Sequence, residues 1–176
     1  MKVVLISGKA GSGKDTTASI MKENLEKRGY NVLVTHYADL LKYVCKTYFL
    51  WNGIKDAEGR QLLQYVGTDL VRNDNPDMWV SFVTSMLKYS KDIWDYVIIP
   101  DCRFPNEIDF VKNNGFDVVT VRIEREEFDS ALSKEQLNHP SETALDRYDF
   151  DVIIHNDATL ARLKRVINYI IKEKYI

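Results

Sequence analysis

A glycine-rich stretch near the N-terminus holds the residues that most clearly predict chemistry. Residues 8–14 match the pattern G-x-x-x-x-G-K, directly after an apolar run and directly before a segment of helical period. Glycines at such a turn let backbone N–H groups approach a phosphate without obstruction by side chains. Lys14 would add a mobile positive charge for the β and γ phosphates, and the helix N-terminus a partial one. The pattern therefore predicts a nucleotide-phosphate loop, against the alternative of a plain glycine turn.

The residues after Lys14 depart from the common form of this pattern. Asp15 stands where Ser or Thr usually follows the lysine, so the hydroxyl that commonly reaches Mg²⁺ is displaced to Thr16. The order is similar to that of adenylate-kinase-like enzymes, which implies that Thr16 serves the phosphates and Mg²⁺. Asp15 has the alternative role of a helix-dipole partner. The predicted cofactor-binding residues of the loop are Gly8, Lys9, Ala10, Gly11, Ser12, Gly13, Lys14, Asp15, Thr16 and Thr17, of which Thr17 is expected to be chiefly structural.

A second group of polar, charged and aromatic residues could receive the phosphoryl group. Its members are Tyr37, Asp39 and Lys42, then Arg60 and Gln64 at i and i+4, then Arg72 and Trp79, and finally Asp101 and Arg103. In an open parallel sheet, the carboxyl ends of the strands form the crevice that binds ligands. We therefore expect Asp39, Asp101 and Arg103 to converge on the glycine loop.

Short apolar runs alternate with longer segments of helical period, and this alternation predicts the fold. Strands are expected at residues 3–6, 31–35, 96–99, 117–123 and 150–154, and helices at 14–27, through much of 38–89, at 104–113 and at 157–172. Gly29 and Gly115 should end two helices. Asn75, Pro76 and Asp77 should begin another, with Asn75 as cap and Pro76 at the first position. The pattern predicts a three-layer α/β/α sandwich around a central parallel sheet of about five strands.

Composition limits the classes of protein that remain. The chain has 176 residues, of which 45% are hydrophobic and 28% charged, as expected of one soluble domain. Its 24 Lys and Arg against 26 Asp and Glu argue against a broad basic face for a nucleic acid polymer. No apolar run approaches the ~18 residues of a membrane span, and the first residues do not resemble a cleavable signal. We expect a cytoplasmic protein with no membrane partner, and a homodimer is compatible with the sequence.

Five short pieces, taken in order, resemble the phage-type deoxynucleoside monophosphate kinases, a branch of the nucleoside monophosphate kinase-like P-loop enzymes. They are Gly-Lys-Asp-Thr at 13–16, Tyr-Ala-Asp-x-x-Lys at 37–42, Gly-Thr-Asp-x-x-Arg at 67–72, Asp-x-Arg-Phe-Pro-Asn-Glu at 101–107 and His-Pro-Ser-Glu at 139–142. The resemblance runs through most of the chain. It implies a P-loop NTPase fold of the nucleoside monophosphate kinase type. It also implies transfer of the γ-phosphoryl group of ATP, with Mg²⁺, to a deoxynucleoside monophosphate, giving the diphosphate and ADP.

Phosphoryl transfer depends on alignment and on neutralising the charge of the phosphate oxygens, so cations should surround the transferred group. The expected catalytic residues are Lys14, Arg125, Asp101 and Arg103, and Thr16 and Asp101 are expected near the metal ion. Arg122 and Asn156 are expected to join the loop in binding ATP. The expected acceptor-binding residues are Tyr37, Asp39, Lys42, Arg60, Gln64, Arg72, Trp79, Arg103 and Glu142, with Tyr37 and Trp79 placed to stack on the base.

Two segments should give the single domain, residues 1–176, its working parts. The helical insertion at about 37–90 would bind the acceptor, and the polar segment at about 125–148 would act as a lid that excludes water. Arg125 is favoured as the charge-stabilising arginine of the lid, with Arg122 behind it. Asn156 follows the fifth strand, where an adenine could rest, whereas Asp157 is favoured as a helix cap.

Other interpretations remain open at this point. The acceptor could be a different phosphorylated metabolite, of the dephospho-coenzyme A or phosphomevalonate type, although Tyr37 and Trp79 favour a base. The chain could also be a regulator that binds a nucleotide without turnover, for which Asp15 is the best support. Trp79 is as well suited to the core as to stacking, and His36 and His155 lack metal-ligand spacing and are expected to pack.

Overall fold

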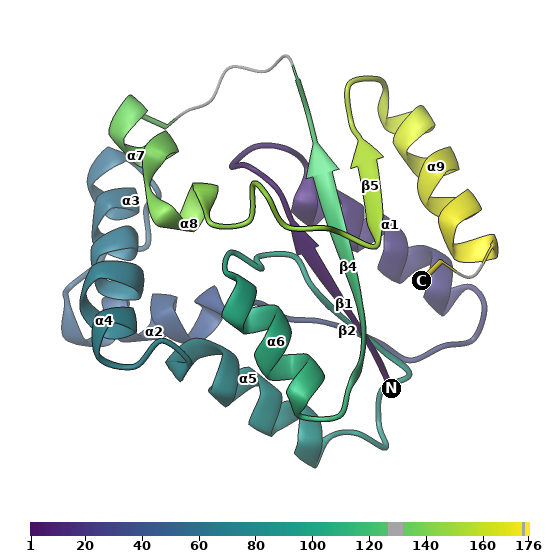
Figure 1. Cartoon of the computed structure of the whole chain (residues 1–176), viewed down its shortest axis with the longest axis horizontal. Coiled ribbons are helices and arrows are strands. Elements are labelled where there is room, and N and C mark those ends of the chain that lie inside the picture. Colours follow the sequence, from purple (N-terminus) through teal and green to yellow (C-terminus); the bar gives the residue numbers. More distant parts are fainter. Residues whose placement is uncertain (127–131, 174) are drawn as a thin grey trace.

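A parallel sheet forms the centre of the protein (Figure 1). The computed structural model describes residues 1–126, 132–173 and 175–176. Its sheet has five strands in the order β2-β3-β1-β4-β5, and every neighbouring pair is parallel. The strands are β1 Lys2–Ser7, β2 Val32–Val34, β3 Tyr96–Ile99, β4 Asp117–Glu124 and β5 Val152–His155. The predicted sandwich with a parallel sheet of about five strands is confirmed.

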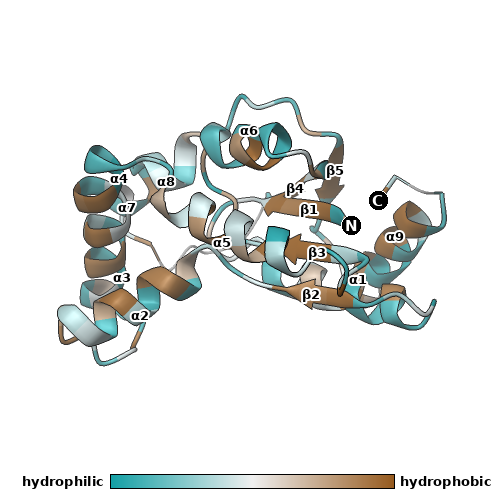
Figure 2. Cartoon of the chain, turned by 90° about the horizontal axis from the view of Figure 1, so that it is seen from below, coloured by the Kyte–Doolittle hydropathy of each residue, from teal (hydrophilic) through white to brown (hydrophobic). Residues whose placement is uncertain are grey.

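Helices cover both faces of the sheet. The apolar strands, brown in Figure 2, bury side chains on both sides: Val4 and Ile6 face one core cluster, and Val3 and Leu5 the other. Helices α1 (Lys14–Glu26) and α9 (Leu160–Lys172) pack on the first face. Helices α5 (Met78–Tyr89) and α6 (Pro105–Asn113) pack on the second. Strands buried on both faces read as continuous apolar runs, which is why they were recognisable in the sequence.

Between β2 and β3 the chain is helical and projects to one side of the sheet (Figure 1). The elements before α5 are α2 Ala38–Tyr48, α3 Ala57–Gln64, η1 Tyr65–Leu70 and α4 Val71–Asp74. A small separate core of Cys45, Trp51 and Val66 holds α2 against α3 and η1. The middle element, η1, is a π-helix, a wider turn that is rare and often found at functional sites.

Two predicted helix starts are wrong. Helix α5 begins at Met78 with Asp77 as its N-cap residue, whereas Asn75 ends α4 and accepts the N–H of Asp77 through its side chain. Helix α9 begins at Leu160 with Thr159 as its cap, whose side chain accepts the N–H of Arg162. In both cases the expected cap is used by another segment.

Asp157, the predicted N-cap of α9, has a different hydrogen-bond partner. Its carboxylate accepts the N–H of Glu126 at 2.7 Å, across from the end of β4. Strand β5, predicted at residues 150–154, begins two residues later and ends one residue later, at Val152–His155. The two predicted C-terminal glycines are confirmed, because Gly29 and Gly115 have φ angles of 88° and 85° just after their helices.

The polar segment after β4 returns over the carboxyl end of the sheet. It contains two short helices, α7 (Lys134–Asn138) and α8 (Pro140–Thr143), which Figure 1 shows beside α3 and α4. Residues 127–131, part of the predicted lid, lie outside the described residues. In the part of the chain that is described, no helix has the length and apolar character needed to cross a membrane.

The cap of α9 gives a test of the corrected boundary. Replacing Thr159 with Ala should lower the free energy of unfolding by about 0.5–1 kcal/mol, because an N–H in the first turn loses its acceptor. Urea denaturation measures this change, and Thr159→Asp should restore most of it. Equal loss on Thr159→Ala and Thr159→Asp would contradict the assignment of the cap.

Candidate functional site

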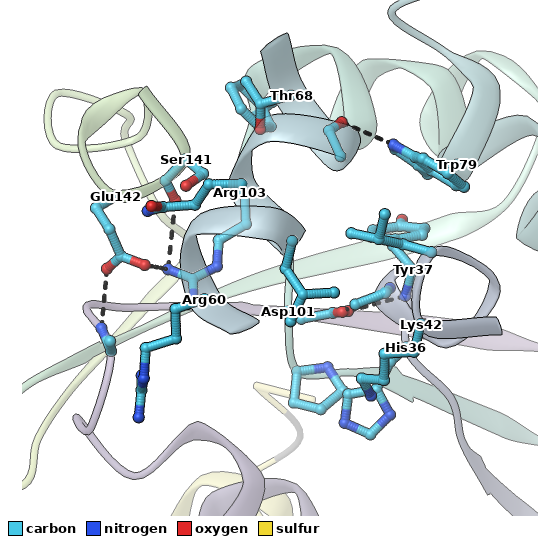
Figure 3. Close-up of a pocket in the computed structure, with 18 of the residues that line it drawn as sticks. His36, Tyr37, Lys42, Arg60, Thr68, Trp79, Asp101, Arg103, Ser141 and Glu142 are labelled. Atoms are coloured by element: carbon cyan, nitrogen blue, oxygen red, sulfur yellow. Dashed lines mark hydrogen bonds and ion pairs between the residues drawn. The ribbon is translucent and has the colours of Figure 1, made fainter. Parts of the chain in front are cut away.

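A cavity of about 460 Å³ opens at the carboxyl end of the sheet, where the glycine loop, the start of α2, the helices α3 to α4, the end of β3 and α8 meet (Figure 3). Most residues that we predicted from the sequence are brought together here. Those that line the cavity are Ala10, Gly11, Lys14, Asp15, Tyr37, Lys42, Arg60, Gln64, Arg72, Trp79, Asp101, Arg103 and Glu142.

The glycine loop needs glycine for conformation and for space. Gly13 has a φ angle of 101°, and a Cβ there would lie 2.5 Å from the side-chain nitrogen of Asn156. Gly8 has a φ angle of 153°, and its Cβ would lie 2.6 Å from the carbonyl oxygen of Ile123. Asn156 donates from Nδ2 to the carbonyl of Ser12 at 2.8 Å. Asn156 therefore braces the loop, whereas its expected contact with ATP stays a prediction.

Lys14 is folded onto the loop that carries it. Its Nζ donates to the carbonyl oxygens of Gly8, at 2.9 Å, and of Lys9, at 2.8 Å. Burial, and then the positive charge of Arg103, lower the pKa of Lys14 to about 7. An anionic ligand in the loop would supply the negative charge that this ammonium group lacks.

Arg103 and Glu142 connect the end of β3 to the loop and to α8. Arg103 Nη1 lies 2.8 Å from Glu142 Oε1 and also donates to the carbonyls of Gly8 and Ser141. The other carboxylate oxygen of Glu142 accepts the N–H of Ala10 at 2.9 Å. This buried carboxylate thus holds the loop, a cavity arginine and the late polar segment in one arrangement.

Arg72 is held by three neighbours from the start of α6. Its Nη1 lies 3.2 Å from Glu107 Oε1, and its Nη2 donates to Asn106 Oδ1 at 2.6 Å. The guanidinium carbon lies 3.7 Å from the centre of the Phe104 ring. Burial raises the pKa of Glu107 to about 7, against the opposing effect of the N–H groups of Arg103 and Phe104 and of the Arg72 charge.

Asp101 and Asp15 each contact residues at or just before the start of α2. Both oxygens of Asp101 accept backbone N–H groups, from Tyr37 at 3.0 Å and Ala38 at 2.9 Å, and burial raises its pKa. Asp15 Oδ1 lies 3.2 Å from His36 Nε2. This contact lowers the pKa of Asp15 and raises that of His36. His36 thus has a charged partner in the cavity, so our expectation that it merely packs is wrong.

The aromatic residues line the cavity from within the core. Trp79 and Tyr37 are each only 4% exposed, and Trp79 Nε1 donates to the carbonyl of Gly67 at 2.9 Å. Arg60 donates from Nε to the carbonyl of Lys55 at 2.9 Å, and both Arg60 and Gln64 line the cavity. Stacking of a base on these rings stays a prediction.

A second, smaller cavity of about 180 Å³ is lined by Lys9, Ser12, Arg122, Ile123, Glu124, Arg125 and Glu126. Arg122 lies 3.0 Å from Asp146 and donates to Ser7 Oγ at 3.3 Å. Arg125 Nη1 lies 3.5 Å from the carbonyl oxygen of Gly11. The two predicted lid arginines therefore lie at the glycine loop, and they do not line the larger cavity.

A few predicted residues line neither cavity. Thr16 is exposed, whereas the buried Thr17 hydroxyl has no hydrogen-bond partner among the described residues. Asp39 pairs with Lys42 at 2.8 Å. Within the described ranges, no three His, Cys, Asp or Glu side chains are grouped so that they could hold a metal ion.

Sequence reasoning missed several residues of the larger cavity, namely His36, Lys55, Thr68, Phe104, Glu107 and Ser141. Phe104 and Glu107 belong to the piece that begins at Asp101, so their position beside Arg103 could have indicated them. Lys55 lies in an irregular connection and carries no sequence signal that distinguishes it from a solvated charge.

The loop between β1 and α1, and the cavity at the carboxyl ends of the strands, are those of a P-loop NTPase fold. A solved sugar kinase from Janibacter sp. HTCC2649 has the same fold. The match covers 99% of this chain and 96% of that one, with 12% identity and a TM-score of 0.58. At this identity the likeness concerns the fold alone.

The sequence comparisons identify the family within this class. The deoxynucleotide monophosphate kinase family matches residues 36–167. A protein of Acanthamoeba polyphaga mimivirus, provisionally named as such a kinase, is 28% identical over 91% of both chains. The deoxynucleotide monophosphate kinase of Enterobacteria phage T4 is 33% identical over 64% of this chain and 45% of its own.

The chain therefore belongs to the deoxynucleotide monophosphate kinase family. Membership makes it an ATP-dependent nucleotide kinase, as the sequence resemblance predicted. It favours this interpretation over a kinase for another phosphorylated metabolite and over a regulator without turnover.

The raised pKa of Glu107 predicts a pH dependence of stability. Because its pKa is about 7 in the folded chain against an ordinary 4.5, the folded chain holds this proton more tightly between those values. The contribution of Glu107 to the free energy of unfolding should therefore fall as pH rises through this window and stay constant outside it. Denaturation at several pH values should show wild type losing stability relative to Glu107→Gln across the window. A constant difference between the two proteins would contradict this.

Proposed function

We propose that the larger cavity receives a deoxynucleoside monophosphate and aligns its phosphate with the γ-phosphate of ATP in the glycine loop. One observation carries this proposal: Lys14 and three arginines, Arg60, Arg72 and Arg103, line the same cavity. Two phosphate groups brought together need such a concentration of positive charge. The buried aromatic wall on the same cavity suits a base.

On the donor side, the loop amides and Lys14 would hold the phosphates of ATP. Lys14 would exchange the carbonyls of Gly8 and Lys9 for phosphate oxygens, which are stronger acceptors for an ammonium group. Arg122 and Arg125, at the smaller cavity beside the loop, would assist at the nucleotide, and Asn156 would support the loop. Arg125 keeps the expected role of stabilising the charge that develops during transfer.

On the acceptor side, Arg72 and Arg60 would bind the monophosphate from the helical insertion. A guanidinium group can bind two phosphate oxygens at once, which fixes the direction of the phosphate as well as its place. Tyr37 and Trp79 would contact the base, with Gln64 and Lys42 as polar neighbours. Arg103 would act between the two phosphates, next to Lys14.

The residues around the loop fit Mg²⁺. The exposed Asp15 carboxylate and Thr16 hydroxyl offer the oxygen donors that this ion prefers, and it commonly takes only one or two such ligands besides phosphate and water. Mg²⁺ would neutralise phosphate charge during transfer. Asp101, whose oxygens already accept two backbone N–H groups, would act as expected by orienting water or a cation.

The segment at about 125–148 is proposed to close over the substrates, and the helical insertion at about 37–90 to carry the acceptor. Support for the lid comes from Glu142 and Lys9, which tie α8 to the glycine loop, because Lys9 Nζ donates to the Glu142 carbonyl and to Asp146. Closure would exclude the water that competes as acceptor. A homodimer stays a prediction.

A screen of acceptors tests the function directly. Purified protein with ATP and Mg²⁺ is incubated with dAMP, dCMP, dGMP or dTMP, and the release of ADP is measured. Formation of diphosphate from at least one of them is expected. Normal binding of ATP without diphosphate from any of the four would overturn the proposal.

Replacing Lys14 with Ala should lower kcat by about 100-fold or more, because a charge that stabilises the transferred group is lost. The fold should be retained, since the partners of Lys14 are carbonyl groups of its own loop. Steady-state kinetics and circular dichroism measure the two effects. A rate like that of wild type would refute the role of Lys14.

Replacing Arg72 with Lys should raise the KM for the monophosphate at least tenfold and leave the KM for ATP nearly unchanged. The charge is kept but the two-pronged contact with the phosphate is lost. Kinetics with each substrate varied in turn make the measurement, and an equal rise in both KM values would contradict the assignment.

A further inference from the structure

We propose that Glu107 is a positioning residue of the acceptor site, which acts by fixing the plane and direction of the Arg72 guanidinium group. This inference rests on the proposed function, because it concerns how the monophosphate is held. Glu107 was not among the residues expected from the sequence to act, yet it lines the larger cavity together with Arg72 and Phe104.

The Arg72 guanidinium group is held at both terminal nitrogens and on one face. Glu107 Oε1 and Asn106 Oδ1 accept from its two terminal nitrogens, at 3.2 and 2.6 Å. The ring of Phe104 lies under its guanidinium face at 3.7 Å. Among the described residues, no partner is found for Nε or for the second hydrogen on each terminal nitrogen. These three N–H groups are the part of Arg72 left to bind a ligand.

Glu107 is itself rigidly held. Its second oxygen, Oε2, accepts the N–H groups of Arg103 at 2.7 Å and Phe104 at 3.1 Å, at the start of α6. The Glu107 side chain is 5% exposed and that of Arg72 is 9% exposed. The Glu107 carboxylate therefore fixes Arg72, which belongs to the helical insertion, relative to the end of β3 and the start of α6.

This arrangement matters because a free arginine has many rotamers, and ordering it on binding costs affinity. A guanidinium group that is already oriented loses less freedom when it binds a phosphate. An unpaired Arg72 in this largely buried place would also be drawn to other acceptors, including carbonyl groups nearby. Glu107 thus contributes through Arg72 and makes no contact of its own with the acceptor.

The test uses the variant Glu107→Gln, which is close in shape. The side-chain oxygen of Gln can still accept the N–H groups of Arg103 and Phe104, whereas its amide group would face Arg72 donor to donor. The KM of the monophosphate that wild type phosphorylates best should rise about tenfold, with the KM for ATP unchanged. Calorimetric titration with the same monophosphate, without ATP, should show a matching rise in Kd.

A double-mutant cycle separates positioning from general damage. In the Arg72→Lys background, Glu107→Gln should have almost no further effect on the acceptor KM, because the flat group that Glu107 orients is gone. Asn106→Ala, which removes the other acceptor, should raise the acceptor KM in the same direction as Glu107→Gln. The control Asp151→Asn changes a carboxylate that accepts from Thr120, away from both cavities, and should leave both KM values unchanged.

The outcomes distinguish failure of the proposed function from failure of the role of Glu107 alone. A wild-type protein that phosphorylates none of the four monophosphates overturns the proposed function, and with it this inference. Turnover by wild type together with an unchanged acceptor KM in Glu107→Gln overturns the role of Glu107 alone. Equal effects of Glu107→Gln in the wild-type and Arg72→Lys backgrounds would show that Glu107 does not act through Arg72, and would also overturn the inference.

Discussion

The site depends on positive charge that is withdrawn from water before any ligand arrives. Burial of Lys14, Arg72 and Arg103 at one end of the sheet is costly unless each cation has acceptors nearby. Two buried carboxylates, Glu107 and Glu142, form ion pairs with Arg72 and Arg103. Carbonyl groups of the loop accept hydrogen bonds from Lys14. Each carboxylate also accepts backbone N–H groups, so the charge balance and the local backbone conformation are set by the same atoms.

These pairs also explain how segments distant in the sequence come to share one cavity. Glu142 joins α8 to the glycine loop and to the end of β3, and Glu107 joins α6 to the helical insertion at Arg72. Asp101 adds a third connection, because its two oxygens accept the N–H groups of Tyr37 and Ala38 at the start of α2. The packed sheet gives the site a rigid support. A few charged contacts at its edge fix the positions of the side chains that line the cavity.

The sheet, the glycine loop and most cavity residues could be predicted because their signals are local. Apolar runs, the spacing of glycines and the order of short motifs lie within a few neighbouring residues. Contacts across the sequence carry no such signal. Asp157 reads as a helix cap, but a backbone N–H from the end of β4 occupies it, and Thr159 takes its place. His36 likewise reads as packing, because nothing near it in the sequence reveals that Asp15 lies beside it.

The π-helix η1 affects which side chains of the helical insertion face the cavity. Arg60, Gln64, Thr68 and Arg72 all line the cavity at intervals of four, yet in a plain α-helix such a row drifts sideways by about 40° at each step. The wider turn at Tyr65–Leu70 rotates less per residue and keeps the row straight. A regular α-helix of the same length would turn Arg72 about 120° away from Arg60. The wide turn at Tyr65–Leu70 therefore keeps Arg60 and Arg72 on the same side of the helical insertion.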